Sequence, residues 1–323
     1  MLAVVISQNG GPEVLEPGER PEPVAGEGQL LVALEAAGVN FRDVYERRGG
    51  YGTPPPLVAG AEGAGSVVAL GAGVSEFAVG DRVSWTSATG SYAERVLVAA
   101  DRAVQVPDAV SSEQAAAVLL QGMTAHYLAT STYPIRPRDD VLVHAAAGGV
   151  GLLLTQIAKM RGARVIATAS TDDKRRMARE HGADETIGYE GFADAVRELT
   201  GGAGVHVVYD GIGRDTFDAG LSVLRPRGLM ALYGAASGQP EPLELNRLAA
   251  GGSLFVTRPT LPYYTASRDD LLARAEQVFE WVATGRLRVL IGGRYPLADA
   301  RRAHEDLESR RTQGKLILTP GLA

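Results

Sequence analysis

From Asp140 onward, short apolar segments alternate with helix-like stretches, and this alternation constrains the fold more than any other feature of the chain. Parallel strands need a crossover of a dozen or more residues between them, which is usually a helix. Six such strands with covering helices predict an α/β fold with a doubly wound parallel sheet. We expect the strands at 141–146, 164–169, 185–189, 206–210, 229–234 and 253–258, with the helical stretches between them including 215–228.

The first of these segments runs into a glycine-rich turn and then into a helix-like stretch. The turn, residues 146–151, reads AAGGVG, which is the dinucleotide-binding fingerprint with its first glycine replaced by Ala146. Gly148 allows close approach to a pyrophosphate, and Gly151 allows the helix to pack tightly on the strand. The helix start adds unpaired N–H groups and about half a positive charge. This turn therefore predicts a dinucleotide site.

The end of the second strand indicates which dinucleotide binds. An NAD site usually has a carboxylate there for the ribose 2′-hydroxyl, but residues 168–170 read TAS. Lys174 follows at a distance suited to a 2′-phosphate, which carries about −1.5 to −2 charges. Asp172 and Asp173 weigh against a phosphate, although the helix dipole also explains them, and Lys174 could be a solvated helix residue. The pattern favours NADPH.

The N-terminal third has a different pattern. Residues 1–110 contain short strands bounded by turn residues, which predicts an antiparallel barrel-like or sandwich domain. Ser111 and Gln114 form a candidate capping box before a buried helix. A helix near 269–284, a helix near 299–310 and a last strand follow the parallel-sheet region. We therefore expect a discontinuous first domain, 1–125 with 264–323, around a cofactor domain at 126–263.

Composition and motif searches exclude several function classes. Cysteine is absent, which removes disulfides, thiolate nucleophiles and Cys-ligated metals. The histidines show no tight ligand spacing, so we expect no metal site and interpret His144 as a hydrogen-bonded core residue. A net charge of −6 argues against general nucleic-acid binding. With no long apolar run and no secretion signal after Met1, we expect a cytoplasmic protein without a membrane partner.

Ordered motifs along nearly the whole chain carry a family resemblance. The chain resembles the zinc-independent quinone oxidoreductases, or ζ-crystallin group, of the medium-chain dehydrogenase/reductase superfamily. Zinc alcohol dehydrogenases have Gly-His-Glu where this chain has Gly60-Ala61-Glu62, so the resemblance is to the metal-free branch. The motifs that carry it are AAGVNFRDVYERRGGY (36–51), GAEGAGSVVALGAGVSEFAVGDRV (60–83), AAAGGVGLLLTQIAK (145–159), VVYDGIGRD (207–215), LMALYGAASG (229–238), FVTRPTL (255–261) and AHEDLESRRTQGKLIL (303–318).

The resemblance implies a GroES-like β-barrel-type catalytic domain beside the doubly wound, Rossmann-type domain. It also implies a set of cofactor contacts, in which the helix before the fingerprint contributes either Thr124 or Tyr127. The implied cofactor-binding residues are Asn40, Phe41, Tyr45, Thr124, Tyr127, Gly148, Gly149, Val150, Ser170, Lys174, Tyr189, Gly211, Ile212, Tyr233, Gly234, Thr257, Arg258 and Arg310. Of these, Gly211 occupies a position that varies in the family.

Three residues are candidates for catalysis by the same resemblance. Tyr51 corresponds to a suspected proton donor in enoyl thioester reductases, and a phenol near pKa 10 could donate a proton after hydride delivery. It could equally be an aromatic wall for a flat quinone. Asn40 could hydrogen-bond a substrate carbonyl, or it could be a loop-turn asparagine. Tyr45 would line the substrate side of the same loop.

The implied activity is NADPH-dependent reduction of a quinone or conjugated carbonyl by direct hydride transfer. One alternative is an enone or 2-enoyl thioester reductase with little quinone activity. A different class is a non-catalytic NADPH-binding redox sensor or RNA-binding protein. Family members form homodimers, and the apolar segment 253–259 could pair with a second copy as a sheet edge, although a buried strand would read identically.

Overall fold

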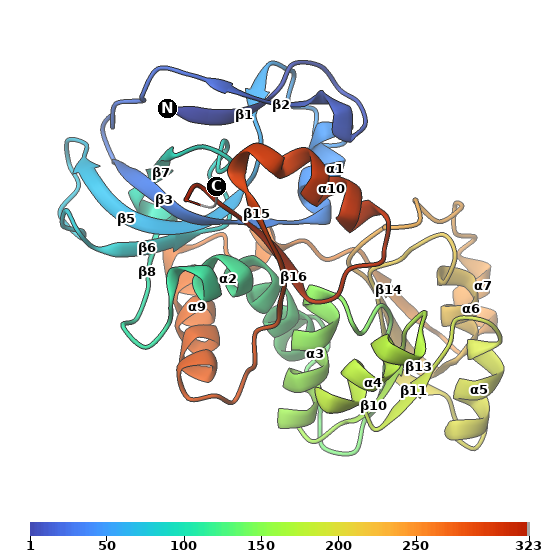
Figure 1. Cartoon of the computed structure of the whole chain (residues 1–323). Coiled ribbons are helices and arrows are strands. Elements are labelled where there is room, and N and C mark those ends of the chain that lie inside the picture. Colours follow the sequence, from blue (N-terminus) through green and yellow to red (C-terminus); the bar gives the residue numbers. More distant parts are fainter. Residues whose placement is uncertain (322–323) are drawn as a thin grey trace. The chain divides into compact units, whose positions relative to one another are not determined.

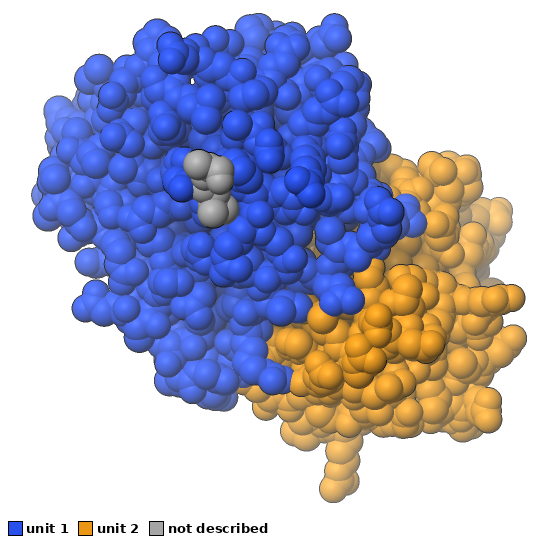
Figure 2. Space-filling model, in the orientation of Figure 1, with its two compact units in different colours: residues 1–120, 265–323 blue, residues 121–264 orange. Residues whose placement is uncertain are grey.

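The structure is a computed structural model that describes residues 1–321. The chain divides into two compact units, which Figure 2 colours blue and orange. Unit 1 comprises residues 1–120 and 265–323, and unit 2 comprises residues 121–264. The first unit is discontinuous because the chain leaves it for the second unit and then returns.

Unit 2 is a doubly wound α/β domain, as the alternating pattern predicts. Its sheet has the strand order β11-β10-β9-β12-β13-β14, and each neighbouring pair is parallel. Figure 1 labels β10, β11, β13 and β14 of this sheet. The order reverses between β9 and β12, so their carboxyl ends form the topological switch point at which such sheets bind ligands. The strands are β9 (Asp140–Val143), β10 (Arg164–Thr168), β11 (Glu185–Ile187), β12 (Val205–Asp210), β13 (Leu224–Leu232) and β14 (Phe255–Thr257).

Helices connect the strands of unit 2 and bury apolar faces against the sheet. Leu142, Ile166, Val208 and Met230 from four strands form a core with residues of the helices. The helical segments are π-helical Leu128–Thr132, α3 (Gly149–Met160), α4 (Asp172–Glu180), α5 (Phe192–Leu199), α6 (Phe217–Ser222), α7 (Asn246–Ala250) and α8 (Leu261–Tyr264).

One predicted helix of unit 2 is wrong over its second half. The expected helical stretch 215–228 ends at Ser222, and β13 begins at Leu224. Pro226 cannot donate a helical hydrogen bond, and Arg227 has a positive φ of 59°, which no α-helix accepts. The leucines and valine before them fit either structure, so the apolar pattern does not locate the end of the helix.

Unit 1 is built around long antiparallel strands. Its main sheet has the order β15-β16-β3-β5-β6-β8, with β7 also pairing with β3, and a smaller sheet has the order β2-β1-β4. These sheets confirm the expected GroES-like, barrel-type domain. The strands are β1 (Leu2–Ile6), β2 (Leu15–Glu19), β3 (Gln29–Val39), β4 (Leu57–Val58), β5 (Glu62–Leu70), β6 (Arg82–Trp85), β7 (Arg95–Ala99), β8 (Val104–Gln105), β15 (Ile291–Pro296) and β16 (Lys315–Thr319).

The C-terminal tail completes the main sheet of unit 1. Strand β16 pairs antiparallel with β3, with Leu316 opposite Val39. The predicted capping box is present, because Gln114 N–H donates to Ser111 Oγ and Ser111 N–H donates to Gln114 Oε1. The α-helices that begin in unit 1 are α1 (Phe41–Arg47), α2 (Ser112–Tyr127), α9 (Arg268–Ala283) and α10 (Ala300–Glu308), and short 3₁₀ turns lie at Pro12–Val14, Ala100–Arg102 and Leu297–Asp299.

None of the helices in residues 1–321 combines the length and the apolar character that a bilayer span requires.

Candidate cofactor and active site

The glycine-rich turn of residues 146–151, hereafter the glycine turn, joins β9 to α3. Gly148 is the N-cap of α3, so the first N–H groups of this helix have no partner within the helix. A Cβ on Gly151 would lie 2.3 Å from Ala145 O, which shows why the helix can pack on the strand only with glycine there. Gly148 and Val150 are half-exposed, so their main chain can meet a ligand. The arrangement suits a pyrophosphate.

The residues expected around the adenosine phosphate lie at the same edge of the sheet. Ser170 is exposed after β10, and Lys174 lies half-buried in the first turn of α4. Burial lowers the pKa of the Lys174 ammonium. The Tyr189 hydroxyl accepts a hydrogen bond from Ala145 N–H at 3.1 Å, which links the residues after β11 to the glycine turn. This donor set fits a phosphorylated ribose.

His144 is a core residue, as its sequence context predicts. Its ring has no exposed surface, and Nδ1 lies 2.9 Å from Thr168 Oγ1. The ring packs edge-on against Phe192, with 4.9 Å between ring centroids. Burial lowers its pKa to about 4, partly offset by the charge of Asp210. The imidazole is therefore neutral near pH 7 and stabilises the sheet beneath the turn.

A second turn, after β12, carries Gly211 and Ile212. The buried Asp210 shapes it, because its Oδ1 accepts from Ile212 N–H at 2.7 Å and from Gly213 N–H at 3.0 Å. Its Oδ2 accepts from Thr216 Oγ1 at 2.8 Å. Sequence reasoning missed this anchor, although an acidic residue that ends an apolar strand before Gly-x-Gly is a usable signal.

Gly211 lies against the residues that follow β13. A Cβ on Gly211 would come 2.9 Å from the Tyr233 ring, and one on Gly234 would come 2.5 Å from Gly211 O. Arg258, after β14, donates to Leu232 O at 2.9 Å and to Gly234 O at 2.7 Å. The predicted residues Gly211, Ile212, Tyr233, Gly234, Thr257 and Arg258 thus gather at the carboxyl ends of neighbouring strands.

The two alternatives on α2, Thr124 and Tyr127, are both buried. Tyr127 is 1% exposed, its ring stacks on Tyr264 at 4.1 Å between centroids, and its hydroxyl donates to Pro259 O. Burial raises its pKa well above the usual range. A side chain enclosed in this way presents little surface, and the cofactor contact expected of Tyr127 stays a prediction. Thr124, one turn earlier, is 8% exposed.

The expected residues of unit 1 lie where β3 ends and α1 begins. Asn40 is the N-cap of α1, and its N–H donates to Asp43 Oδ2 at 2.9 Å. Phe41 and Tyr45 lie one turn apart on α1, with ring centroids 6.4 Å apart. Tyr51 is 55% exposed, and the Arg42 guanidinium lies 5.5 Å from its ring centroid. The structure therefore groups these four candidates within one short segment.

The side chain of Asn40 is only 4% exposed and belongs to a buried cluster. Lys315 Nζ donates to Asn40 Oδ1 at 2.7 Å, and Asn40 Nδ2 donates to Glu62 Oε2 at 2.9 Å. Lys315 and Glu62 form an ion pair of 2.5 Å. We call these three residues the Asn40 clamp. A hydrogen bond from Asn40 to a substrate would have to use its second N–H, which points to Gly38 O at 3.4 Å.

A second buried network adjoins the clamp through Asp43. Arg47 Nη1 lies 3.1 Å from His304 Nδ1 and can only donate, so His304 Nε2 carries the proton toward Tyr92 Oη, 3.1 Å away. The Tyr92 hydroxyl donates to Asp43 Oδ2. Burial raises the pKa of Asp43 to about 6 and lowers that of His304 to about 3. Sequence reasoning missed this network.

Arg310, the remaining predicted contact, is exposed just after α10 with a φ of 57°. Glu308 at the end of α10 pairs with Arg47, which ties this segment to α1 within unit 1.

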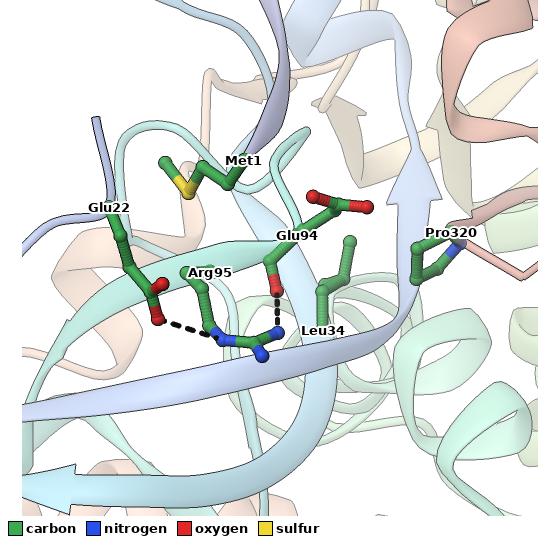
Figure 3. A pocket seen from close by; sticks show the side chains of 6 residues that line it. All are labelled: Met1, Glu22, Leu34, Glu94, Arg95 and Pro320. Carbon is green, nitrogen blue, oxygen red and sulfur yellow. Dashed lines mark hydrogen bonds and ion pairs between the residues drawn. The ribbon is translucent and has the colours of Figure 1, made fainter. Parts of the chain in front are cut away.

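No group of three or more His, Cys, Asp or Glu side chains that could hold a metal ion occurs within residues 1–321. A cavity of about 250 Å³ lies elsewhere in unit 1, and Figure 3 shows Arg95 bridging Glu22 and the Glu94 carbonyl at its wall. It contains none of the predicted site residues. Its lining comprises Met1, Glu22, Leu34, Glu94, Arg95 and Pro320.

Comparisons with known proteins agree with this architecture. A family model described as "Zinc-binding dehydrogenase" matches residues 149–261, and one described as "Alcohol dehydrogenase GroES-like domain" matches residues 26–108. A quinone oxidoreductase of Pseudomonas aeruginosa is 45% identical over 96% of this chain and 97% of its own length. A 2-haloacrylate reductase of a Burkholderia species is 40% identical, with 99% of each chain covered.

A solved structure gives the same result. The crystal structure of Escherichia coli quinone oxidoreductase complexed with NADPH has a TM-score of 0.96 and 42% identity, covering 99% of this chain and 100% of that one. These matches confirm the resemblance that the motifs carry. The chain belongs to the quinone oxidoreductase family of the medium-chain dehydrogenase/reductase superfamily.

Proposed function

We propose that this protein is an NADPH-dependent quinone oxidoreductase that transfers a hydride directly to its substrate. The observation that carries the proposal is the glycine turn, with unpaired N–H groups at the start of α3 and Lys174 at the same sheet edge. The relatives named quinone oxidoreductase, one of them solved with NADPH, support the same activity.

The residues of unit 2 hold the cofactor in this proposal. The N–H groups of Gly149 and Val150 bind the pyrophosphate, and Ser170, Lys174 and Tyr189 bind the phosphorylated ribose. The segments of Gly211, Ile212, Tyr233, Gly234, Thr257 and Arg258 border the nicotinamide half, and Thr124 or Tyr127 contributes from α2. NADPH, when bound, supplies the hydride, so the protein needs only to provide geometry and charge.

Residues of unit 1 serve the substrate. Tyr45 and Tyr51 orient a flat quinone or conjugated carbonyl, and Asn40 fixes the loop that carries them. Tyr51 has two possible roles, proton donor or aromatic wall. Its 55% exposure and the Arg42 guanidinium beside its ring are compatible with either role. If a Tyr51→Phe variant has unchanged turnover, Tyr51 is not the proton donor and serves only as an aromatic wall for the substrate.

We propose that the chemistry is zinc-independent. Ala61 occupies the position of the zinc-binding histidine in the related alcohol dehydrogenases and offers no ligand atom. Activity should therefore be the same after prolonged dialysis against a chelator as before it.

We also propose a cytoplasmic homodimer. Strand β14 is an edge of the parallel sheet, and Phe255 on it is 59% exposed. An exposed apolar edge strand favours pairing with a second copy. Sedimentation of the purified protein should give twice the chain mass, and Phe255→Lys should shift it toward the monomer.

The function is tested by NADPH oxidation with a panel of acceptors comprising quinones, a simple enone and a 2-enoyl thioester. We expect the fastest oxidation with a quinone. Faster oxidation with the enone or thioester would favour the second candidate, an enone reductase, which the 2-haloacrylate reductase relative supports. If NADPH binds but no acceptor is reduced, the protein is a sensor, and filter binding would then test for RNA.

A further inference from the structure

Unit 1 encloses a complete charged pair at the end of β3. Lys315 is 2% exposed and Glu62 is 0% exposed. Removing two charges from water costs several kcal/mol per ion, and apolar residues of similar volume usually stabilise a fold as well or better. Such a pair is therefore weak evidence of a contribution to stability, which leaves a positional role to be tested.

The pair determines the orientation of the Asn40 amide. A lysine ammonium only donates hydrogen bonds and a carboxylate only accepts them. Lys315 therefore requires Oδ1 on its side, and Glu62 requires Nδ2 on its side. A flipped amide would place its N–H₂ group against the ammonium and its oxygen against the carboxylate. The Asn40 clamp thus permits one orientation.

The fold prepares the clamp from three distant segments. Gly38 leaves room for the carboxylate, because a Cβ there would lie 2.2 Å from Glu62 Oε2. Glu62 Oε1 accepts from Leu120 N–H at 2.7 Å, which anchors the carboxylate to α2. Lys315 begins β16, whose pairing with β3 brings the ammonium to Asn40. Each charged group is therefore held by elements other than α1.

We infer that Lys315 is a positioning residue, which acts with Glu62 to lock Asn40 and thereby the loop and helix that carry Phe41 and Tyr45. This inference rests on the proposed function, in which that segment serves the substrate. The ammonium also polarises the Asn40 amide through a charge-assisted hydrogen bond to Oδ1, which strengthens its N–H groups as donors. Loss of Lys315 should lower turnover and leave NADPH affinity intact.

The kinetic test uses the full chain and three variants. Lys315→Met removes the ammonium, and the double variant Lys315→Met with Glu62→Gln removes both charges, so that no unpaired buried charge prevents folding. Lys315→Arg retains a buried cation. Lys159→Met is the matched control, because it breaks a surface lysine–carboxylate pair with Asp184 in unit 2.

We expect kcat to fall at least tenfold in both Met variants, with NADPH Kd within twofold of the wild type. Lys315→Arg should recover most of the loss, and Lys159→Met should be unchanged. A folded, NADPH-binding double variant with kcat within twofold of the wild type would overturn the inference. So would a kcat loss matched by an equal loss of NADPH affinity.

A second measurement does not depend on activity. The side-chain amide protons of Asn40 are assigned by NMR from their disappearance in Asn40→Asp. We expect slow solvent exchange in the wild type and at least tenfold faster exchange in the double variant. Equal exchange rates of these protons in the wild type and the double variant would show that Lys315 and Glu62 do not hold the Asn40 amide. The wild-type protein could show slow exchange of the Asn40 amide protons although none of the tested acceptors supports NADPH oxidation. That result would contradict the proposed function but not the Asn40 clamp.

Discussion

The two units build their sites in opposite ways. In unit 2 the site is mostly main chain, with α3 beginning inside the glycine turn and a strand and a helix directly on either side. In unit 1 the site is side chains, and Asn40, Glu62 and Lys315 come from positions far apart in the sequence. The first arrangement is recognisable within about twenty residues of sequence, whereas the second exists only after folding.

The units also differ in how they handle charge. The turns of unit 2 present N–H groups, and the carboxylate of Asp210 is fully satisfied by neighbours a few residues away. Unit 1 instead buries lysine, arginine and carboxylates together, so each charge depends on partners in other elements. Substitutions should therefore act locally on ligand binding in unit 2 and across several elements in unit 1.

The largest effect is expected at Gly151. A β-branched side chain there meets Ala145 O and Ala146 Cα, so Gly151→Val should push α3 off β9 and reduce NADPH affinity at least a hundredfold. Calorimetric titration with NADPH measures the loss. Gly188→Ala is the matched control, because its Cβ would make an ordinary contact of 3.7 Å with Arg175. Equal NADPH affinity in the Gly151 variant would contradict the role of the turn.

A smaller effect is expected at Asp210. Asp210→Ala leaves the N–H groups of Ile212 and Gly213 without acceptors, at about 1–3 kcal/mol for each unsatisfied group, and leaves Thr216 Oγ1 with only its longer bond to Gly213 O. The free energy of unfolding of unit 2 should fall by about 3 kcal/mol, measured by urea denaturation. Thr216→Val removes one of these donors and should cost less than half as much. An unaltered denaturation midpoint in Asp210→Ala would show that the anchor is dispensable.

Lys174→Met should change cofactor choice. Loss of a charge-assisted hydrogen bond of about 1.5–3 kcal/mol predicts a roughly 10- to 100-fold weaker NADPH affinity, with NADH affinity unchanged. Lys159→Met provides the control for loss of a lysine on the same unit. If both nucleotides lose affinity equally, Lys174 supports the helix instead of the phosphate.

The last prediction concerns pH, because two buried groups, His144 in unit 2 and Asp43 in unit 1, contribute with opposite signs. The folded pKa of His144 is about 4, so between pH 4 and 6.5 the unfolded chain binds a proton that the folded chain does not. Stability therefore rises with pH by about 3 kcal/mol from this group. Asp43, with its pKa raised to about 6, binds its proton more tightly when folded, so its contribution falls as pH rises from about 4 to 6.

Urea denaturation from pH 4.5 to 6.5 separates these two contributions. Relative to the wild type, His144→Asn should become less stable as pH rises, and Asp43→Asn should become more stable. The same trend in both variants would show that His144 and Asp43 do not contribute in opposite directions.

The sequence predicts more of the structure of unit 2 than of unit 1. Hydrophobic runs locate the parallel strands, and the glycine turn predicts the proposed cofactor site, because both signals are local. The end of α6 is missed because apolar residues before Pro226 suit a helix or a strand. The clamp and the Tyr92–His304 contact are missed because antiparallel pairing of β16 with β3 and the packing of α10 create them.

Hydrogen exchange along the backbone tests the central claim most directly. The amides of residues 148–151 are measured by mass spectrometry with and without NADPH on the full-length protein. The account predicts strong protection of this segment, and of the start of α4 around Lys174, on addition of NADPH. Unchanged exchange in the glycine turn at saturating NADPH, or protection confined to other segments, would contradict it.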